Sequence, residues 1–550
     1  MAFEWLNESS RKFLESGYLV DGQSVEDRIR DIAETAEKHL GIEGYADKFF
    51  EYMSRGYYSL SSPVWSNYGT DRGLPVSCFG SFIEDDMGSI LDAHGENGML
   101  MKHGGGTSGY FGALRPRGSA IYKNGVSSGS VHFLELFDKL SSIVSQGSVR
   151  RGFFTGYLPI EHDDIEEFLD VGTEGHPIQL ITTGVTVGSK FLRDVIEGDS
   201  EKRRIWAKLL QIRSEIGYPY IFFSDNVNEG KPDVYKDKNM KIWASNMCAE
   251  IALPSSDEET FTCVLSSINV LHWDEIKDTD AIETLVYFLD TVVTEFVNRT
   301  EDMPYHKKAR LFSQRHRALG LGILGWHSYL QSKMIAFESD EAVDKNLEIA
   351  KTLNSRSYSA SRELAEMFGE PEHLVGYGRR NTTLLAIAPT KSSSFILGQV
   401  SQSIEPEFSN NYVKDLSKVK TTIKNPYLKK ILEEMGKDTR DVWDSIRSMD
   451  GSVQHLEFLD DHTKSVFKTF SEIDPYVIVR QAGDRQKYID QSQSLNLMLD
   501  PSMSVAEVNR LYLSAWEQGV KSLYYSFSMS QAQSLIRKKI SEMECTTCAL

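Results

Sequence analysis

The sequence predicts an α/β protein with a largely parallel, buried sheet. Beyond about residue 56, apolar runs typical of buried strands (RRGFFTGYL, YPYIFF, NTTLLAIAP) alternate with amphipathic segments typical of helices, such as VHFLELFDKLSSIVSQG. Parallel strands that are covered on both faces read as continuous apolar runs, and helices usually connect them. At 550 residues and 40% hydrophobic content, the chain is long enough to bury a large core.

The chain before residue 56 has a different character and predicts a short helical lead-in. Ser24 is a candidate N-cap, and apolar residues follow near helical spacing at Val25, Ile29, Ile32, Ala36 and Leu40. Beyond about residue 535 the chain becomes polar and ends in MECTTCAL. We therefore expect a helical region at 1–55, a main domain at 56–535 and a flexible tail at 536–550.

A helix followed by a strand is predicted near the end of the main domain. Ser504 and Glu507 form a capping box, a hydrophobic face runs from Val505 to Trp516, and Gly519 can end the helix. The apolar run KSLYYSF comes next and reads as a strand.

The net charge of −19 argues against a general nucleic-acid binder, because phosphate backbones are held mainly by clustered Lys and Arg. A small anionic ligand stays compatible with an acidic chain, since helix N-termini can bind phosphate. The first residues, MAFEWLNESSRKF, lack the features of a secretory signal, and no apolar run approaches the roughly 20 residues that span a bilayer. We expect a cytoplasmic protein without nucleic-acid or membrane partners.

Five cysteines, without an export signal, are expected to be thiols rather than a disulfide scaffold. In Asn246-Met247-Cys248-Ala249-Glu250, an extended backbone would place the amide, thiol and carboxylate on one face. A buried cysteine with two solvated neighbours explains the same pentapeptide equally well. Cys263 alone would be a core cysteine.

The tail pair Cys545 and Cys548 has three interpretations: half a zinc site, a redox dithiol or incidental thiols. A structural zinc usually needs four ligands, and the sequence offers no second CxxC or nearby His pair. A CxxC on a mobile tail suits thiol–disulfide exchange, which we favour.

Three other segments are ambiguous by themselves. The loop HGGGTSGYFGALRPRG at 103–118 could bind phosphate or be a flexible turn, and it fits no standard phosphate motif. APTKSSSF at 388–395 could be a phosphate site after a strand or a simple N-cap cluster. Tyr524 and Tyr525 would face opposite sides of a strand and read as packing residues.

Together these segments resemble the catalytic large subunit of a class I ribonucleotide reductase. The similarity covers most of the chain and includes PVSCFGSFIEDDMGSI, SQGSVRRG, SNMCAEIALP, TCVLSSIN, RHRALGLGILG, APTKSSS, the LYY strand and the cysteine tail. All five cysteines match functional positions of that family. The resemblance implies a ten-stranded α/β barrel with a central finger loop that carries Cys248 at its tip, and it implies reduction of ribonucleoside diphosphates to deoxyribonucleoside diphosphates.

The resemblance also implies roles for the thiols and their neighbours. Cys248 would carry a thiyl radical that takes the 3′ hydrogen of the ribose, Glu250 would be the general base, and Asn246 would bind the sugar hydroxyls. Cys78 and Cys263 would supply two electrons and end as a disulfide. Such chemistry requires a sulfur radical, a dithiol and a carboxylate for proton transfer.

Partners follow from the same resemblance. Cys545 and Cys548 would shuttle electrons to the buried pair and be recharged by thioredoxin or glutaredoxin. A small subunit with a metal-based radical source would supply the radical, which Tyr525 and then Tyr524 would pass to Cys248. No cofactor is expected to be tightly bound in this chain, and a homodimer is expected.

Nucleotide sites are implied as well. Substrate diphosphate would lie against Ser62, Ser77, Thr390, Ser392 and Ser393. A deoxynucleotide or ATP effector would bind at the dimer interface. Its contacts would be Asp85, Arg115, Lys123, Gln146 and Arg150.

Two alternatives and one departure remain at this point. A cobalamin-dependent class II reductase would share the barrel and cysteine chemistry, but Tyr524 and Tyr525 favour class I. A nucleotide-regulated redox-sensing protein would not need the complete set of catalytic residues. Only 77 residues precede Cys78, fewer than family members with an N-terminal ATP-cone need, so we expect no such cone.

Overall fold

The computed structural model describes residues 2–20, 22–146, 150–416, 419–500 and 502–528. Its first part is helical, with α1 (Glu8–Glu15), α2 (Val25–Leu40) and α3 (Tyr45–Ser54). The predicted cap of α2 is confirmed, because Ser24 and Asp27 form a capping box, and Gly41 ends the helix at φ 65°. The predicted lead-in is therefore two helices, α2 and α3, and α1 precedes them.

A ring of ten strand segments forms the centre of the molecule. Five parallel strands make one half: β2 (Cys78–Phe82), β3 (Gly106–Tyr110), β8 (Phe154–Pro159), β9 (Thr182–Val187) and β10 (Tyr220–Phe223). The other half consists of β11 (Phe261–Asn269), β12 (Leu319–Leu324), residues 385–387, residues 493–499 with β15 (Leu497–Leu499), and residues 522–528 with β16 (Ser522–Leu523) and β17 (Ser526–Ser528).

Antiparallel pairs join the two halves, β2 with β11 on one side and β10 with β16 on the other. Within the second half, bridges at Leu321–Leu385 and Ile387–Gln493 and the bond from the Tyr524 amide to the Leu495 carbonyl link successive segments and complete the ring. The predicted barrel is thus confirmed. β1 (Tyr58–Leu60) adds an antiparallel partner to the second half of β11.

The segment 246–252 crosses the interior of this ring. On one side the Tyr157 hydroxyl of β8 donates to the Asn246 carbonyl at 2.7 Å. On the other side the Ser522 hydroxyl donates to the Ala249 carbonyl at 2.6 Å, and the Ser492 amide donates to the Glu250 carbonyl at 2.9 Å. Because both halves of the ring hold it, this segment is the predicted finger loop.

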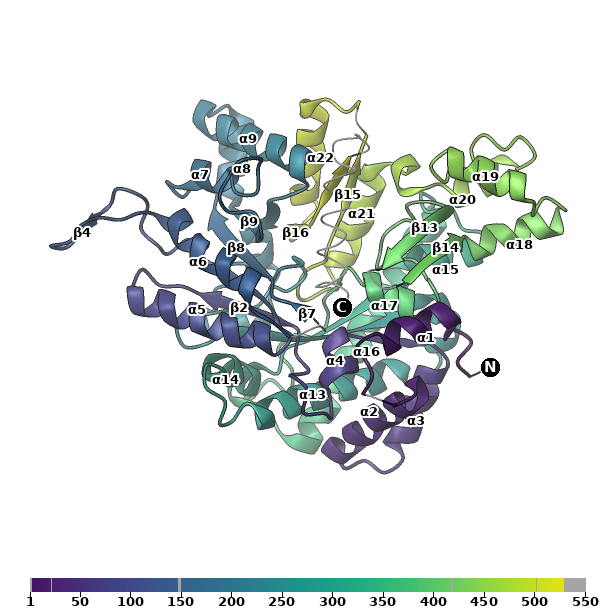
Figure 1. Cartoon of the computed structure of the whole chain (residues 1–550), viewed down its shortest axis with the longest axis horizontal. Coiled ribbons are helices and arrows are strands. Elements are labelled where there is room, and N and C mark those ends of the chain that lie inside the picture. Colours follow the sequence, from purple (N-terminus) through teal and green to yellow (C-terminus); the bar gives the residue numbers. More distant parts are fainter. Residues whose placement is uncertain (1, 21, 147–149, 417–418, 501, 529–550) are drawn as a thin grey trace.

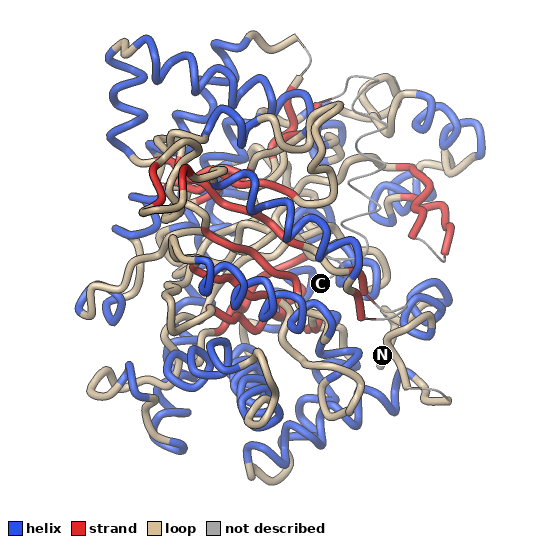
Figure 2. The backbone as a smooth tube through the Cα atoms, turned by 60° about the vertical axis from the view of Figure 1, so that its left-hand side comes forward, coloured by secondary structure: helices blue, strands red, loops and turns tan. Residues whose placement is uncertain are grey.

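Helices surround the strands, as the central strands and outer helices of Figure 2 show. α13 (Ala281–Arg299) is mostly buried, and it packs against α2, α16 (Asp340–Phe368) and strands β11 and β12. The remaining helices along the ring are α4 (Ser62–Asn67), α5 (Met87–Lys102), α6 (Ser130–Ile143), α7 (Ile165–Leu169), α8 (Ser189–Glu197), α9 (Ser200–Ile216), α10 (Ser224–Glu229), α11 (Asp233–Asp237), α12 (Trp273–Ile276), α13 (Ala281–Arg299), α14 (Lys307–His316), α15 (Trp326–Ser332), α16 (Asp340–Phe368), α17 (Lys391–Ile396), α21 (Pro475–Gln486) and α22 (Val505–Glu517). Three 3₁₀ turns join them: η1 (Val270–His272), η2 (Glu372–Leu374) and η3 (Phe470–Glu472).

Smaller units extend from the ring. α18 (Pro426–Glu434), α19 (Arg440–Ser448) and α20 (Asp461–Val466) pack around Trp443 and Phe467 beside the hairpin β13 (Asn411–Leu416) and β14 (Val419–Lys424), at the upper right of Figure 1. The short hairpin β4 (Ala120–Ile121) and β5 (Gly125–Val126) projects at the far left. A third hairpin pairs β6 (Ser145–Gln146) with β7 (Arg150–Arg151). Among the described helices, none has the length and hydropathy needed to cross a membrane.

The predicted unit near the C-terminus forms with one difference. α22 has the Ser504–Glu507 capping box, and Gly519 follows at φ 78°. The predicted strand KSLYYSF is interrupted, since β16 ends at Leu523 and β17 begins at Ser526. Tyr524 and Tyr525 occupy the break.

Candidate functional site

Two of the predicted site cysteines face each other across neighbouring strands. Cys78 begins β2, Cys263 lies in β11, and the antiparallel register places them directly opposite each other. Both thiols are buried. Directly opposed residues in an antiparallel pair have Cα atoms about 4.5–5.5 Å apart, which lies within the span that a disulfide bridges. The strands can therefore hold this pair either as two thiols or as a disulfide.

Amide side chains contact both sulfur atoms. Asn246 Nδ2 donates to Cys78 Sγ at 3.4 Å, and Gln491 Nε2 donates to Cys263 Sγ at 3.4 Å. Burial raises the pKa of the Cys263 thiol well above its usual range. Gln491 was missed by the sequence analysis, because it lies in a polar run, DQSQS, that gives no indication of its contact with a cysteine.

Cys248 lies at the tip of the finger loop, in a turn rather than in an extended strand. Ala249 adopts φ 64°, and its amide donates to the Asn246 carbonyl at 3.3 Å. The extended conformation predicted for Asn246–Glu250 is therefore wrong. The side chains still converge, because the turn brings Glu250 back to Asn246, and the two side chains form a hydrogen bond.

The Glu250 carboxyl is almost completely buried, at 1% exposure. Burial raises its pKa to about 7, although hydrogen bonds from Asn246 and Ser494 act in the opposite direction. Ser494 Oγ lies 3.4 Å from Glu250 Oε2 and also donates to the Cys248 carbonyl at 2.5 Å. A carboxyl with a pKa near neutrality can both accept and return a proton, as general acid–base chemistry requires.

Three tyrosine rings pack in the same cluster as the loop tip. Tyr524 and Tyr525 are both buried, with ring centroids 4.4 Å apart. Tyr220 of β10 lies 4.8 Å from the Tyr524 ring and 5.2 Å from the Tyr525 ring. These rings share a buried cluster with Met247, Cys248 and Ala249.

The prediction that Tyr524 and Tyr525 face opposite sides of a strand is wrong, because the strand is interrupted at these two residues and their rings turn toward each other. Tyr220 was missed as a site residue. It lies in YPYIFF, which the sequence analysis read only as a buried strand.

Residues predicted for the substrate phosphates gather around the start of α17. Thr390 precedes this helix at φ 52°, and its hydroxyl accepts from the Ser403 amide at 2.7 Å. The Ser59 hydroxyl of β1 donates to the Ser393 carbonyl at 3.2 Å, and β1 leads directly into α4, which begins at Ser62. The β1–α4 turn and the start of α17 therefore lie side by side.

Two buried hydroxyls in this region have no hydrogen-bond partner within the part of the chain that the structure describes. They belong to Ser392 and to Ser403, both fully buried. A buried hydroxyl without a partner is costly, and a bound anion would relieve that cost. Ser77, the remaining predicted phosphate contact, accepts from the Cys78 thiol at 3.5 Å and so lies beside the cysteine pair. Ser403 is an addition that the sequence analysis missed.

Three predicted effector residues, Asp85, Arg115 and Lys123, lie on or beside the projecting β4–β5 hairpin, whereas Gln146 and Arg150 lie on the separate β6–β7 hairpin. Arg115 Nε pairs with Asp85 Oδ2 at 2.6 Å, and the Arg115 guanidinium also donates to the Ala120 carbonyl. Lys123 lies on the hairpin turn with its Nζ 5.0 Å from the centre of the exposed Tyr122 ring. Gln146 and Arg150 are paired residues of β6 and β7. Cys545 and Cys548 lie outside the described residues.

Comparisons with known proteins agree with this arrangement. Residues 76–202, 198–374 and 370–526 match the family model "Ribonucleotide reductase, barrel domain", and residues 4–73 match "Ribonucleotide reductase, all-alpha domain". A Frog virus 3 (isolate Goorha) protein assigned as a ribonucleoside-diphosphate reductase large subunit is 37% identical over 511 residues, which is 89% of each chain. The large subunit of Invertebrate iridescent virus 3 is 31% identical over 560 residues, 88% of each chain.

A solved structure is also similar along nearly the whole chain. The Actinobacillus ureae class Id ribonucleotide reductase alpha subunit superposes with a TM-score of 0.92 at 58% sequence identity. The match covers 96% of this chain and 98% of the other.

Proposed function

Because this chain belongs to the ribonucleotide reductase family, as a large subunit of the class I ribonucleoside-diphosphate reductases, we propose that its barrel interior reduces ribonucleoside diphosphates by thiyl-radical chemistry at Cys248. The observation that carries the proposal is the convergence of two sets of groups. The opposed thiols of Cys78 and Cys263 contact the amides of Asn246 and Gln491, and Asn246 also bonds Glu250, two residues from Cys248.

Cys248 starts and ends the reaction. Its thiyl form takes the hydrogen atom from C3′ of the ribose, so that the thiol is regenerated and the sugar becomes the radical. Glu250 accepts the proton of the 3′ hydroxyl, for which its pKa near 7 is suited. Asn246 holds the sugar hydroxyls through the part of its amide that faces the loop tip.

Cys78 and Cys263 supply the two electrons. One thiol protonates the departing 2′ hydroxyl, which leaves as water, and the pair becomes a disulfide while C2′ gains hydrogen. Cys248 then returns a hydrogen atom to C3′ and is again a thiyl. The balance is one ribonucleotide and two thiols giving one deoxyribonucleotide, one water and one disulfide. The opposed positions on β2 and β11 support this role, because the disulfide can form without strand movement.

The tail dithiol Cys545 and Cys548 reduces this disulfide by thiol–disulfide exchange, and thioredoxin or glutaredoxin reduces the tail in turn. A tail is needed for this step because Cys263 is fully buried and Cys78 is 4% exposed, so that a folded reductase cannot reach either sulfur directly.

A small subunit with a metal-based radical cofactor is the proposed partner, and that cofactor supplies the one-electron oxidation of Cys248. Tyr525 and Tyr524 carry the oxidation inward, which the 4.4 Å ring spacing and their shared cluster with Cys248 support. The class I relatives favour this route over the cobalamin-dependent alternative. The presence of the complete set of predicted catalytic residues also argues against a redox sensor without turnover.

The substrate diphosphate binds where β1–α4 meets the start of α17, with Ser62, Ser77, Thr390, Ser392 and Ser393 as its contacts. The Ser392 hydroxyl, which has no hydrogen-bond partner among the described residues, supports this placement. Deoxynucleotide or ATP effectors bind at the interface of a homodimer, where Asp85, Arg115 and Lys123 meet the effector and Gln146 and Arg150 report its identity. The Asp85–Arg115 pair beside the projecting hairpin supports this second site.

The test is dCDP formation from CDP with a dithiol reductant and a nucleotide effector. One arm contains the cognate small subunit, and the other contains adenosylcobalamin. Activity only with the small subunit is expected. Activity with cobalamin alone would overturn the partner and the tyrosine route, and inactivity in both arms would contradict the reductase assignment.

A further inference from the structure

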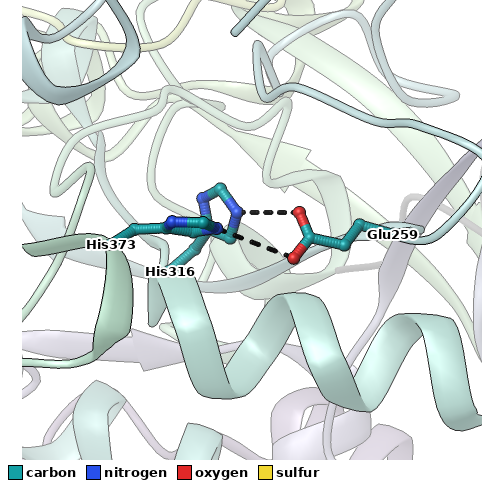
Figure 3. A group of neighbouring side chains, drawn as sticks. All are labelled: Glu259, His316 and His373. Carbon is teal, nitrogen blue, oxygen red and sulfur yellow. Dashed lines mark hydrogen bonds and ion pairs between the residues drawn. The ribbon is translucent and has the colours of Figure 1, made fainter. Parts of the chain in front are cut away.

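Three potential metal ligands converge at a position that the proposed reaction does not use. Glu259 lies in the loop before β11, His316 is the last residue of α14, and His373 lies in η2. His316 Nε2 is 3.1 Å from Glu259 Oε2, and His373 Nε2 is 3.7 Å from Glu259 Oε1. Figure 3 shows both rings directed at the carboxylate, and one donor atom from each residue lies within 4.8 Å of the others.

These spacings suit a small divalent ion. Metal–ligand bonds of about 2.0–2.1 Å in a tetrahedral zinc site place neighbouring donor atoms roughly 3.3 Å apart. The His316 and His373 nitrogens lie 3.1 Å and 3.7 Å from the two different oxygens of the Glu259 carboxylate, which is near that value. Two histidines and one carboxylate are also an established ligand set for zinc, and they leave a coordination position for water.

The hydrogen bonds around His316 direct a lone pair toward the carboxylate. The Tyr235 hydroxyl donates to Thr382 Oγ1 at 2.7 Å, so its oxygen can accept from His316 Nδ1 at 3.2 Å. A neutral imidazole that donates from Nδ1 has its lone pair on Nε2, which faces Glu259. A cation between Nε2 and the carboxylate would satisfy both acceptors.

The remaining groups complete the surroundings of a ligand set. Arg315 donates to Glu259 Oε1 at 3.0 Å and orients the carboxylate, while Glu372 pairs with the same guanidinium at 3.0 Å and offsets its charge. His373 keeps 15% of its side chain exposed, so the site lies near the surface.

We propose that Glu259, His316 and His373 bind one divalent transition-metal ion, Zn²⁺ being the best fit. The ion would tie the loop before β11 to the end of α14 and to η2, three segments that are far apart in the sequence. Glu259 lies four residues before Cys263, so the site would anchor the strand that carries a reducing thiol. His373 is the most informative ligand to change, since its Nε2 has no hydrogen-bond partner among the described residues.

The experiment uses the full chain with Cys545→Ser and Cys548→Ser, because a CxxC tail could itself bind zinc. After removal of metal with a chelator, the protein is dialysed against buffered Zn²⁺, and bound zinc is measured by mass spectrometry. We expect one zinc per chain. His373→Gln should weaken binding by at least about tenfold, since even the loss of an outer partner of a metal ligand costs about 10- to 100-fold. The exposed His132→Gln variant should retain full binding.

A second measurement uses the unsubstituted ligands, so it tests the site even if His373→Gln fails to fold. Co²⁺ bound to the unsubstituted ligands should give a visible spectrum without the charge-transfer band of a cobalt–thiolate bond. No bound zinc, equal binding by His373→Gln and its parent, or a thiolate band would each overturn the site. None of these outcomes depends on nucleotide reduction, so they are independent of the proposed function.

Discussion

Cys78 and Cys263 occupy directly opposed positions of the antiparallel strands β2 and β11, at the junction of the two halves of the barrel. The two thiols come from points 185 residues apart in the sequence, yet strand register alone brings them face to face. Asn246 from the finger loop contacts the first of them at 3.4 Å. The two opposed thiols and the finger loop are therefore parts of one site.

This register predicts a specific disulfide after a single turnover. The Cys545→Ser, Cys548→Ser protein, reduced beforehand and mixed with CDP, effector and small subunit but no reductant, should form a Cys78–Cys263 bond, since no tail thiol can reopen it. Peptide mapping by mass spectrometry reads the product. Cys263→Ser in the same background should form no dCDP, and a dominant disulfide elsewhere would contradict the assignment.

Replacement of Tyr524 by Phe should abolish turnover with the small subunit and leave the fold intact. Phenylalanine keeps the ring contacts but has no hydroxyl to oxidise and deprotonate. We expect loss of dCDP formation with little change in the thermal midpoint, measured by circular dichroism. Tyr305→Phe, at a ring that is 57% exposed, is the matched control and should be fully active. Appreciable activity of Tyr524→Phe would remove this residue from the radical route.

The pKa of Glu250 makes activity depend on pH. As a general base Glu250 must be deprotonated, so kcat should rise with pH through about 7. Glu250→Gln should be inactive at every pH, which a pH–rate profile of both proteins would show. A profile for the unmodified chain that is flat from pH 6 to 8 would exclude this carboxyl as the base.

The folding stability should depend on the same carboxyl, but it should fall as pH rises, whereas kcat should increase. The folded protein holds the Glu250 proton up to about pH 7, whereas the unfolded chain releases it near its ordinary value of 4.5, so stability falls as pH rises between these values. The shift corresponds to about 3 kcal/mol at most. Glu250→Gln should therefore unfold at higher denaturant than the unmodified chain at pH 8, and the difference should shrink toward pH 5. An equal difference at both pH values would contradict the burial argument.

Ser392→Ala should weaken substrate binding with little cost to folding. The hydroxyl is buried without a described partner, so its removal costs no hydrogen bond within the described residues. A lost bond to a charged phosphate is worth about 1.5–3 kcal/mol, or roughly a 10- to 100-fold rise in KM for CDP. Ser357→Ala removes another buried, partnerless hydroxyl, on α16, and should leave KM unchanged. Equal KM values for Ser392→Ala and the unmodified chain would place the phosphates elsewhere.

Much of the chemistry could be predicted from short segments of the chain. Cys248, Glu250 and Asn246 lie within five residues, so a local pattern identifies them together whatever backbone conformation they adopt. The extended conformation predicted for this pentapeptide was nevertheless wrong. Hydrogen bonds from Tyr157 on one half of the barrel and from Ser494 and Ser522 on the other hold it as a turn, and these contacts are non-local.

The same reason explains what was missed. Gln491, Ser494, Ser403 and Tyr220 come from segments whose local patterns read only as polar runs or a buried strand, and each enters the site through a contact with a distant residue. Glu259, His316 and His373 are likewise separated along the chain, and folding alone brings their donor atoms together.

The sequence by itself determined the α/β class, the capped helices α2 and α22, the family and which thiols are the candidates for the reaction. These depend on hydrophobic period, local capping and residues that are adjacent in the chain. Only the tertiary structure decided which thiols face each other, how burial sets the pKa of Glu250, and that the rings of Tyr524 and Tyr525 meet instead of diverging. Those properties depend on strand register, solvent exclusion and interruption of a strand by its neighbours, which arise only when distant segments pack.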